Sequence, residues 1–102
     1  MDKQLKGTAS FEEYIINDLK DEESIREWLS VALEEFLEDG DSNAFVRSLE
    51  YAVRAKDTIS GMSKKTGISR SNLYAIFKGE VTPQLNTVAK ILKELGYTLK
   101  VA

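Results

Sequence analysis

The 102-residue chain has no cysteine and no histidine, and it has a single proline. Without cysteine it can form neither a disulfide nor a thiolate metal site. Without histidine it lacks the commonest zinc ligand and the side chain that most often exchanges protons in catalysis near neutral pH. We therefore expect no metal, no cofactor and no small-molecule substrate.

Long apolar segments are missing as well, because the longest apolar runs are only a few residues. A transmembrane helix needs about 20 predominantly apolar residues. A secretory leader needs an apolar segment near its start, and no such segment follows Met1. We expect a cytoplasmic protein with no membrane contact. The length suits one compact domain with a modest core.

Paired carboxylates do not form a plausible catalytic site in this sequence. Glu12 with Glu13, and Glu34 with Glu35, are consecutive residues in segments with helical patterns. Consecutive helical side chains point about 100° apart, so neither pair can flank one substrate. The sequence also has no glycine-rich phosphate loop and no metal-ligand spacing. We expect a protein that is not an enzyme.

The net charge of −3 conceals a division between the two halves of the chain. Residues 1–50 carry 5 Lys and Arg against 14 Asp and Glu, a net charge of −9. Residues 51–102 carry 9 Lys and Arg against 3 Asp and Glu, a net charge of +6. Because salt screens charge within about 8 Å, a basic face can attract phosphates despite an acidic remainder. The alternative is that these charges merely solvate helix surfaces.

Helical patterns cover nearly the whole chain and predict an all-α fold of five to six helices. A capping box of Ser10 and Glu13 predicts that the first helix opens there and runs through Leu19. Asp21 is placed to cap the second helix, which Gly40 ends. The second helix has the strongest i, i+3, i+4 apolar stripe of the chain, at Ile25, Trp28, Leu29, Ala32, Leu33, Phe36 and Leu37. In this stripe Trp28 is expected to be a core residue rather than an interface residue.

Capping residues and punctuation predict four more helices. Their expected starts are Asp41 or Ser42, Ile59 after a Thr58 cap, about Arg70, and a position at or just after Pro83. The last of them is expected to end at Gly96 and to use Leu85, Val88, Ala89, Leu92 and Leu95 as its apolar positions.

The domain organisation expected from these patterns is one compact domain in three parts. Residues 1–9 are expected to be disordered, residues 10–40 to form an acidic helical extension, and residues 41–102 to form the remaining helices and a short C-terminal β-strand. The strand is predicted because residues 97–101 alternate apolar and polar. A lone strand needs a partner, and the twin strand of a second copy is the simplest one. We therefore expect a homodimer with contacts at Tyr97, Leu99 and Val101.

Residues 58–79, TISGMSKKTGISRSNLYAIFKG, indicate two short helices joined by a tight turn. Gly67 can supply the positive φ of such a turn. Ser63 supplies a small side chain where the two helices cross, and Ser69 can cap the second helix. The first turn of that second helix is small, polar and basic, on an apolar inner face. These features are typical of a helix-turn-helix whose second helix enters the DNA major groove.

The expected DNA contacts follow from helical geometry. Base contacts are expected on the exposed side of the second helix, at Arg70, Ser71, Asn72 and Tyr74. Phosphate contacts, which position the domain without reading sequence, are expected at Ser69, Lys64, Lys65 and Lys78. The alternative is that the two helices only contribute to a small bundle and that Arg70 is an ordinary surface charge.

The segment TGISRSNLYAIFKG, followed by TPQLNTVAKILKELGYTLKV, resembles the repressor-type (Xre, lambda-repressor-like) helix-turn-helix of phage repressors and bacterial regulators. With the preceding acidic helix and ALEEFLEDGDSNAFVRSLEYAVRAK, the chain resembles HigA-like addiction-module antidotes from about Tyr14 to Val101. The resemblance implies a protein that binds operator DNA at its own promoter. It also implies neutralisation of an mRNA-cleaving toxin of the RelE/HigB-like superfamily. Two departures are Ser63, where such motifs usually have alanine, and Gly61, which weakens the supporting helix.

The acidic half offers a candidate toxin surface at the end of the second helix, at Glu34, Glu35, Glu38 and Asp39. Carboxylates at a helix C-terminus oppose the macrodipole, so a functional reason for them is plausible. An acidic surface would steer and cover a basic, RNA-binding toxin. The alternative is a solvated face that limits nonspecific DNA association. At the level of function, the alternative to an antitoxin is a stand-alone phage-type repressor without a toxin, and an adjacent short reading frame for a basic protein would favour the antitoxin.

Overall fold

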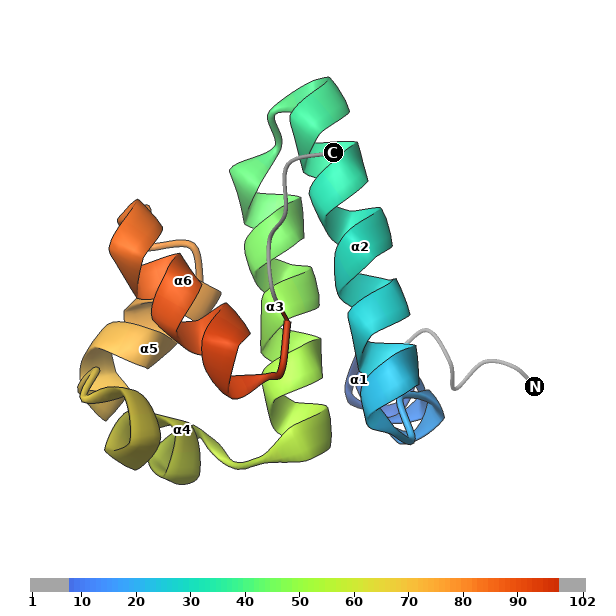
Figure 1. Ribbon diagram of the computed structural model, residues 1–102, viewed down its shortest axis with the longest axis horizontal. Coiled ribbons are helices and arrows are strands. Elements are labelled where there is room, and N and C mark those ends of the chain that lie inside the picture. The colour runs from blue at the N-terminus through green and yellow to red at the C-terminus, as the bar shows by residue number, and fades with distance from the viewer. Residues whose placement is uncertain (1–7, 98–102) are drawn as a thin grey trace.

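The computed structural model describes residues 8–97 of the chain, with side chains from Phe11 onward. This range contains six α-helices and no strand (Figure 1). The helices are α1 (Thr8–Asp18), α2 (Glu22–Asp39), α3 (Ser42–Lys56), α4 (Ile59–Thr66), α5 (Arg70–Phe77) and α6 (Leu85–Glu94). The predicted all-α architecture is confirmed for this range. No helix within it is long and apolar enough to cross a membrane.

Side-chain caps fix the starts of four helices, as the sequence predicts. Asp21, Asp41, Thr58 and Ser69 each accept a hydrogen bond from the backbone N–H three residues later. Each bond satisfies one of the N–H groups that a helix start leaves without a partner. At the other end of α2, Gly40 adopts φ 71° and donates its N–H to the Phe36 carbonyl.

Helix α1 differs from its predicted start, whereas α6 begins just after Pro83, as predicted. Helix α1 begins at Thr8, so Ser10 lies inside it and the capping box predicted there is wrong. Thr8 and Ala9, which were expected to be disordered, are helical. Helix α6 begins at Leu85 after a Gln84 cap that makes no side-chain hydrogen bond.

Two leucines placed in the predicted apolar stripes are exposed instead of buried. Leu85 is 80% exposed because it is the first residue of α6, before the buried positions Ile91 and Leu92 begin. Leu37 is 74% exposed in the last turn of α2. It is rotated by about 120° around the helix from Ile25, so it points away from the buried stripe.

The hydrophobic core forms one cluster to which α2, α3, α4, α5 and α6 all contribute. Helices α2 and α3 lie side by side as a hairpin, α1 packs at its base, and α4 to α6 lie on the opposite side of α3 (Figure 1). Trp28 packs against this core, as predicted, and its indole N–H donates to the Ser48 carbonyl at 2.9 Å. The fully buried side chains include Leu29, Leu49, Val53, Met62, Leu73, Ile76, Ile91 and Leu95.

Two polar contacts tie the acidic α2 to the far end of the chain. The Lys56 ammonium, at the end of α3, lies 3.2 Å from the Glu22 carboxylate and donates to the Glu94 carbonyl at 3.3 Å. The Ser30 and Tyr97 hydroxyls are 3.3 Å apart. Helix α2 is therefore held against the residues that end α6.

The predicted C-terminal strand is not found at its one described residue. Tyr97 has no strand pairing and packs against the core of its own chain. Leu99 and Val101, the other predicted dimer contacts, lie outside the described residues.

Candidate nucleic-acid interface

The turn between α4 and α5 is fixed by four hydrogen bonds around Gly67. Gly67 adopts φ 79°, and its N–H donates to the Ser63 carbonyl at 2.9 Å. The Ser63 hydroxyl donates to the Ile68 carbonyl at 2.6 Å, across the turn. The Thr66 hydroxyl donates to the Met62 carbonyl and accepts the N–H of Ile68. Ser63 is therefore more than a small residue at a crossing, because alanine could not make this bond.

Helix α5 has a polar first turn, and its apolar inner face is buried. Its inner side chains, Leu73, Ile76 and Phe77, are between 0% and 4% exposed. Ser69 caps it by accepting the N–H of Asn72 at 3.1 Å. All the residues predicted to contact bases are exposed at this end of the helix, namely Arg70, Ser71, Asn72 and Tyr74. The sequence placed these four side chains correctly at the surface.

The exposed side chains of α5 do not all point the same way. Ser71 lies opposite the buried face, whereas Arg70 lies on the flank that faces α4. The Arg70 guanidinium donates to the Ser60 hydroxyl, on the first turn of α4, at 3.3 Å. The Arg70 side chain therefore has a defined position between α4 and α5.

The candidate phosphate-binding lysines have different local partners. Lys64, Lys65 and Lys78 are all exposed. The Lys65 ammonium lies 2.9 Å from the Asp57 carboxylate, while no ion pair is found for Lys64 or Lys78 among the described side chains. The hydrogen bond from Lys65, together with one from the N–H of Thr58, lowers the pKa of Asp57. The same bond raises the pKa of Lys65.

Sequence reasoning missed the residues beside α5 on its α4 side. A hollow of about 360 Å³ lies next to Tyr74 and is lined by Arg54, Asp57, Thr58, Ile59, Ser60 and Tyr74. Arg54 and Ser60 were not singled out, because the angle between helices brings them to Tyr74 and Arg70. No local pattern in the sequence signals that angle.

Gly61 also has a structural reason that the sequence did not reveal. It is the third residue of α4, where its N–H bonds to the Thr58 hydroxyl at 2.9 Å. A Cβ atom at this position would overlap the carboxylate of Asp57. Glycine therefore leaves room for the Asp57–Lys65 pair over the start of α4.

A family model of probable addiction module antidote proteins matches residues 8–102. The chain belongs to this family. The search of curated proteins and the search of solved structures returned no match. An addiction module pairs an antidote with a toxin, so the family implies an antitoxin with a toxin partner, and a regulatory role in place of a catalytic one. Within residues 8–97 no group of His, Cys, Asp and Glu could hold a metal ion.

In this antidote protein, the acidic residues predicted to face a toxin lie on two different sides of α2. Glu34 and Glu38 lie on its outer face, opposite the buried Ile25, Leu29 and Ala32. Glu35 and Asp39 line a small hollow toward α3 together with Asp41, whose N–H donates to the Asp39 carboxylate. All four predicted residues are exposed, but they do not form one cluster.

Proposed function

We propose that this antidote protein is a DNA-binding antitoxin that neutralises a RelE/HigB-like toxin and represses its own operon. The observation that carries the DNA-binding part is the exposed, polar first turn of α5 on a buried apolar face. A short helix held in this way can enter a major groove without rearrangement of the core. The family match favours an antitoxin over a stand-alone repressor, because an antidote implies a toxin.

Within this proposal, the exposed side chains of α5 and α4 have separate roles. Arg70 and Ser71 contact base edges, with Asn72 and Tyr74 at the margins. Ser69, Lys64 and Lys78 contact phosphates, and Ser60 extends that contact along the hollow beside Tyr74. Arg54, which also lines the hollow, contributes less because its guanidinium is paired with Glu50 at 2.9 Å. Lys65 contributes less, because its ammonium is already paired with Asp57.

We also propose that the antitoxin acts on DNA as a homodimer. Two copies one helical turn apart would place two α5 helices in successive major grooves of a palindromic site. The dimer contact is assigned to residues 97–101. The Tyr97 hydroxyl itself lies 3.3 Å from the Ser30 hydroxyl of its own chain.

The toxin is proposed to bind the acidic helix α2. A ribonuclease toxin must bind RNA and is therefore basic, so an acidic surface both steers it and covers it. The exposed carboxylates of Glu34 and Glu38, on the outer face of this helix, are assigned to this contact.

One experiment tests the two halves of the proposal together. The antitoxin is co-expressed with the product of the neighbouring reading frame, purified through a tag on one partner, and titrated onto its own promoter fragment. We expect a stable complex, loss of the toxin's RNA cleavage, and tighter binding to the promoter than to bulk DNA at ordinary salt. No complex would contradict the antitoxin role, and no promoter preference would contradict the repressor role.

A further inference from the structure

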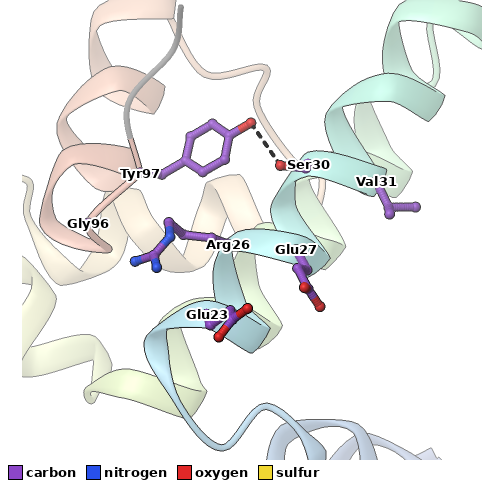
Figure 2. Close-up of a pocket in the computed structure, with 7 residues that line it drawn as sticks. All are labelled: Glu23, Arg26, Glu27, Ser30, Val31, Gly96 and Tyr97. Atoms are coloured by element: carbon purple, nitrogen blue, oxygen red, sulfur yellow. Dashed lines mark hydrogen bonds between the residues drawn. The ribbon is translucent and has the colours of Figure 1, made fainter.

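An open groove of about 940 Å³ separates α2 from the residues that follow α6. One side is lined by Glu23, Arg26, Glu27, Ser30 and Val31 of α2, and the other by Gly96 and Tyr97 (Figure 2). A second hollow on the other side of the same ridge, about 330 Å³, runs toward the end of α1 and shares Glu27 and Val31. These two residues therefore form a raised edge with space on both sides.

The outer face of α2 carries an exposed apolar side chain among unpaired carboxylates. Val31 is 54% exposed, although a valine on a helix surface gains nothing from water contact. Glu23, Glu27, Glu34 and Glu38 fall within about 60° of one another around the helix. None of them is ion-paired with a described side chain. Arg26 also lines the groove and lies 3.8 Å from Glu22, so one cation stands among these carboxylates and the outer face of α2 keeps a net negative charge.

We propose that this groove is where the toxin docks, occupied by a basic segment that places an apolar side chain against Val31 and Tyr97. The inference rests on the proposed antitoxin function, and the charge of the groove selects the occupant. Two carboxylates and an apolar edge fit a cationic segment with one apolar anchor. DNA is not the occupant, because DNA binding is assigned to the basic part of this chain around α4 and α5. The proposal moves the toxin contact from the end of α2 to its outer face, so Glu35 and Asp39 are not part of it.

The test compares matched variants of the full chain, with the toxin from the neighbouring reading frame as the probe. Glu27→Lys is paired with Glu35→Lys, which makes the same charge change on the same helix outside the groove. Val31→Lys is paired with Val81→Lys, the same substitution at a valine that is 46% exposed and lies after α5. All four side chains are exposed, so folding is expected to be retained and is checked by helical circular dichroism.

We expect Glu27→Lys and Val31→Lys to weaken toxin binding by about tenfold or more, because each places a cation against a cationic segment. The two control variants should stay within about twofold of the unmodified chain. Equal losses at Glu35, or no loss at Glu27 and Val31, would overturn the groove while leaving the antitoxin function intact. If Glu27→Lys instead dissociates the free antitoxin into monomers, the occupant is a second copy and the proposal is wrong. If the unmodified chain does not bind the toxin, the proposed antitoxin function itself fails.

Discussion

At the residue scale, the proposed base recognition depends most on Arg70. Its hydrogen bond to Ser60 is single and exposed, so exchanging it for a guanine edge costs little. Arg70→Ala is expected to lose about 1–3 kcal/mol of binding free energy and to relax specificity at one base position. Competition assays with single-base operator variants measure this effect.

The matched control for Arg70 is Lys64→Ala, in an exposed side chain assigned to phosphate. It should weaken binding to all sequences alike and lower the slope of log K against log salt by roughly one. A uniform loss from Arg70→Ala would contradict a base-reading role for Arg70.

Gly61 and Asp57 are expected to be energetically coupled. Replacing a helical glycine by alanine normally stabilises a protein by about 0.5–1 kcal/mol. Here the new Cβ would displace the Asp57 carboxylate from Thr58 and Lys65, so Gly61→Ala should give no gain or a loss. In the Asp57→Ala background the ordinary gain of about 0.5–1 kcal/mol should return. Urea unfolding of the four chains gives the comparison, and equal effects in both backgrounds would exclude the coupling.

The stability of the protein should fall in acid because two carboxyl groups are held ionised by hydrogen bonds. The main cause of the lowered pKa of Asp57 is the hydrogen bond from Lys65, and the main cause of the lowered pKa of Asp21 is the hydrogen bond from the Ser24 N–H. A carboxyl with a lowered folded-state pKa contributes stability that is complete above its ordinary value of 3.8. This contribution is lost as the pH falls through the lowered folded-state value.

Urea unfolding at a series of pH values from neutral to acid measures this loss. Asp57→Asn should flatten the acid side of the profile, because the amide does not titrate. The same change at Asp39, for which no ion pair is found among the described side chains, serves as the control variant. An unchanged acid slope in Asp57→Asn would show that this carboxyl does not contribute.

At the scale of the element, two serines in one helix separate stability from recognition. Ser69→Ala removes the cap of α5 and should lower the free energy of unfolding by about 1 kcal/mol. Ser71→Ala, in an exposed side chain two residues later, should leave stability nearly unchanged and weaken operator binding. Thermal unfolding and promoter titration of both variants distinguish the two roles. Equal stability losses would contradict the assignment.

At the scale of the whole molecule, the dimer proposal predicts a large effect from a short truncation. Deletion of residues 98–102 keeps Tyr97 and its contact with Ser30, and it removes the other proposed dimer contacts. We expect a monomer by light scattering and a loss of roughly 100-fold or more in operator affinity, because two linked sites bind together far more tightly than one. Deletion of residues 1–7 is the control and should keep the dimer. An unchanged mass after the C-terminal deletion would exclude that segment from the contact.

The fold was predictable wherever the determining interaction is local. The caps at Asp21, Asp41, Thr58 and Ser69, and the turn at Gly67, each depend on atoms within a few residues. The start of α1 was wrong because a capping-box pattern also occurs inside helices. The burial predicted for Leu37 and Leu85 was wrong, because Leu37 points away from the buried stripe of α2 and Leu85 precedes the buried positions of α6.

In the candidate site, too, local features were predictable and contacts between elements were not. Its exposed residues followed from the period of α5, since burial of Leu73, Ile76 and Phe77 leaves Arg70, Ser71, Asn72 and Tyr74 outside. The contacts of Arg70 with Ser60 and of Lys65 with Asp57 join different elements, so only packing could reveal them.

The sequence by itself determined the helices, four of their caps, the apolar face of α5 and the charge of each half, because these depend on residue order and helical period. Tertiary structure alone decided that Lys56 and Tyr97 hold α2 beside the end of α6. It also decided that Glu27 and Val31 border a groove while Glu35 faces the other way. The physical reason is that helical period gives the direction of an exposed side chain, whereas a groove forms only where a segment distant in sequence packs beside that side chain.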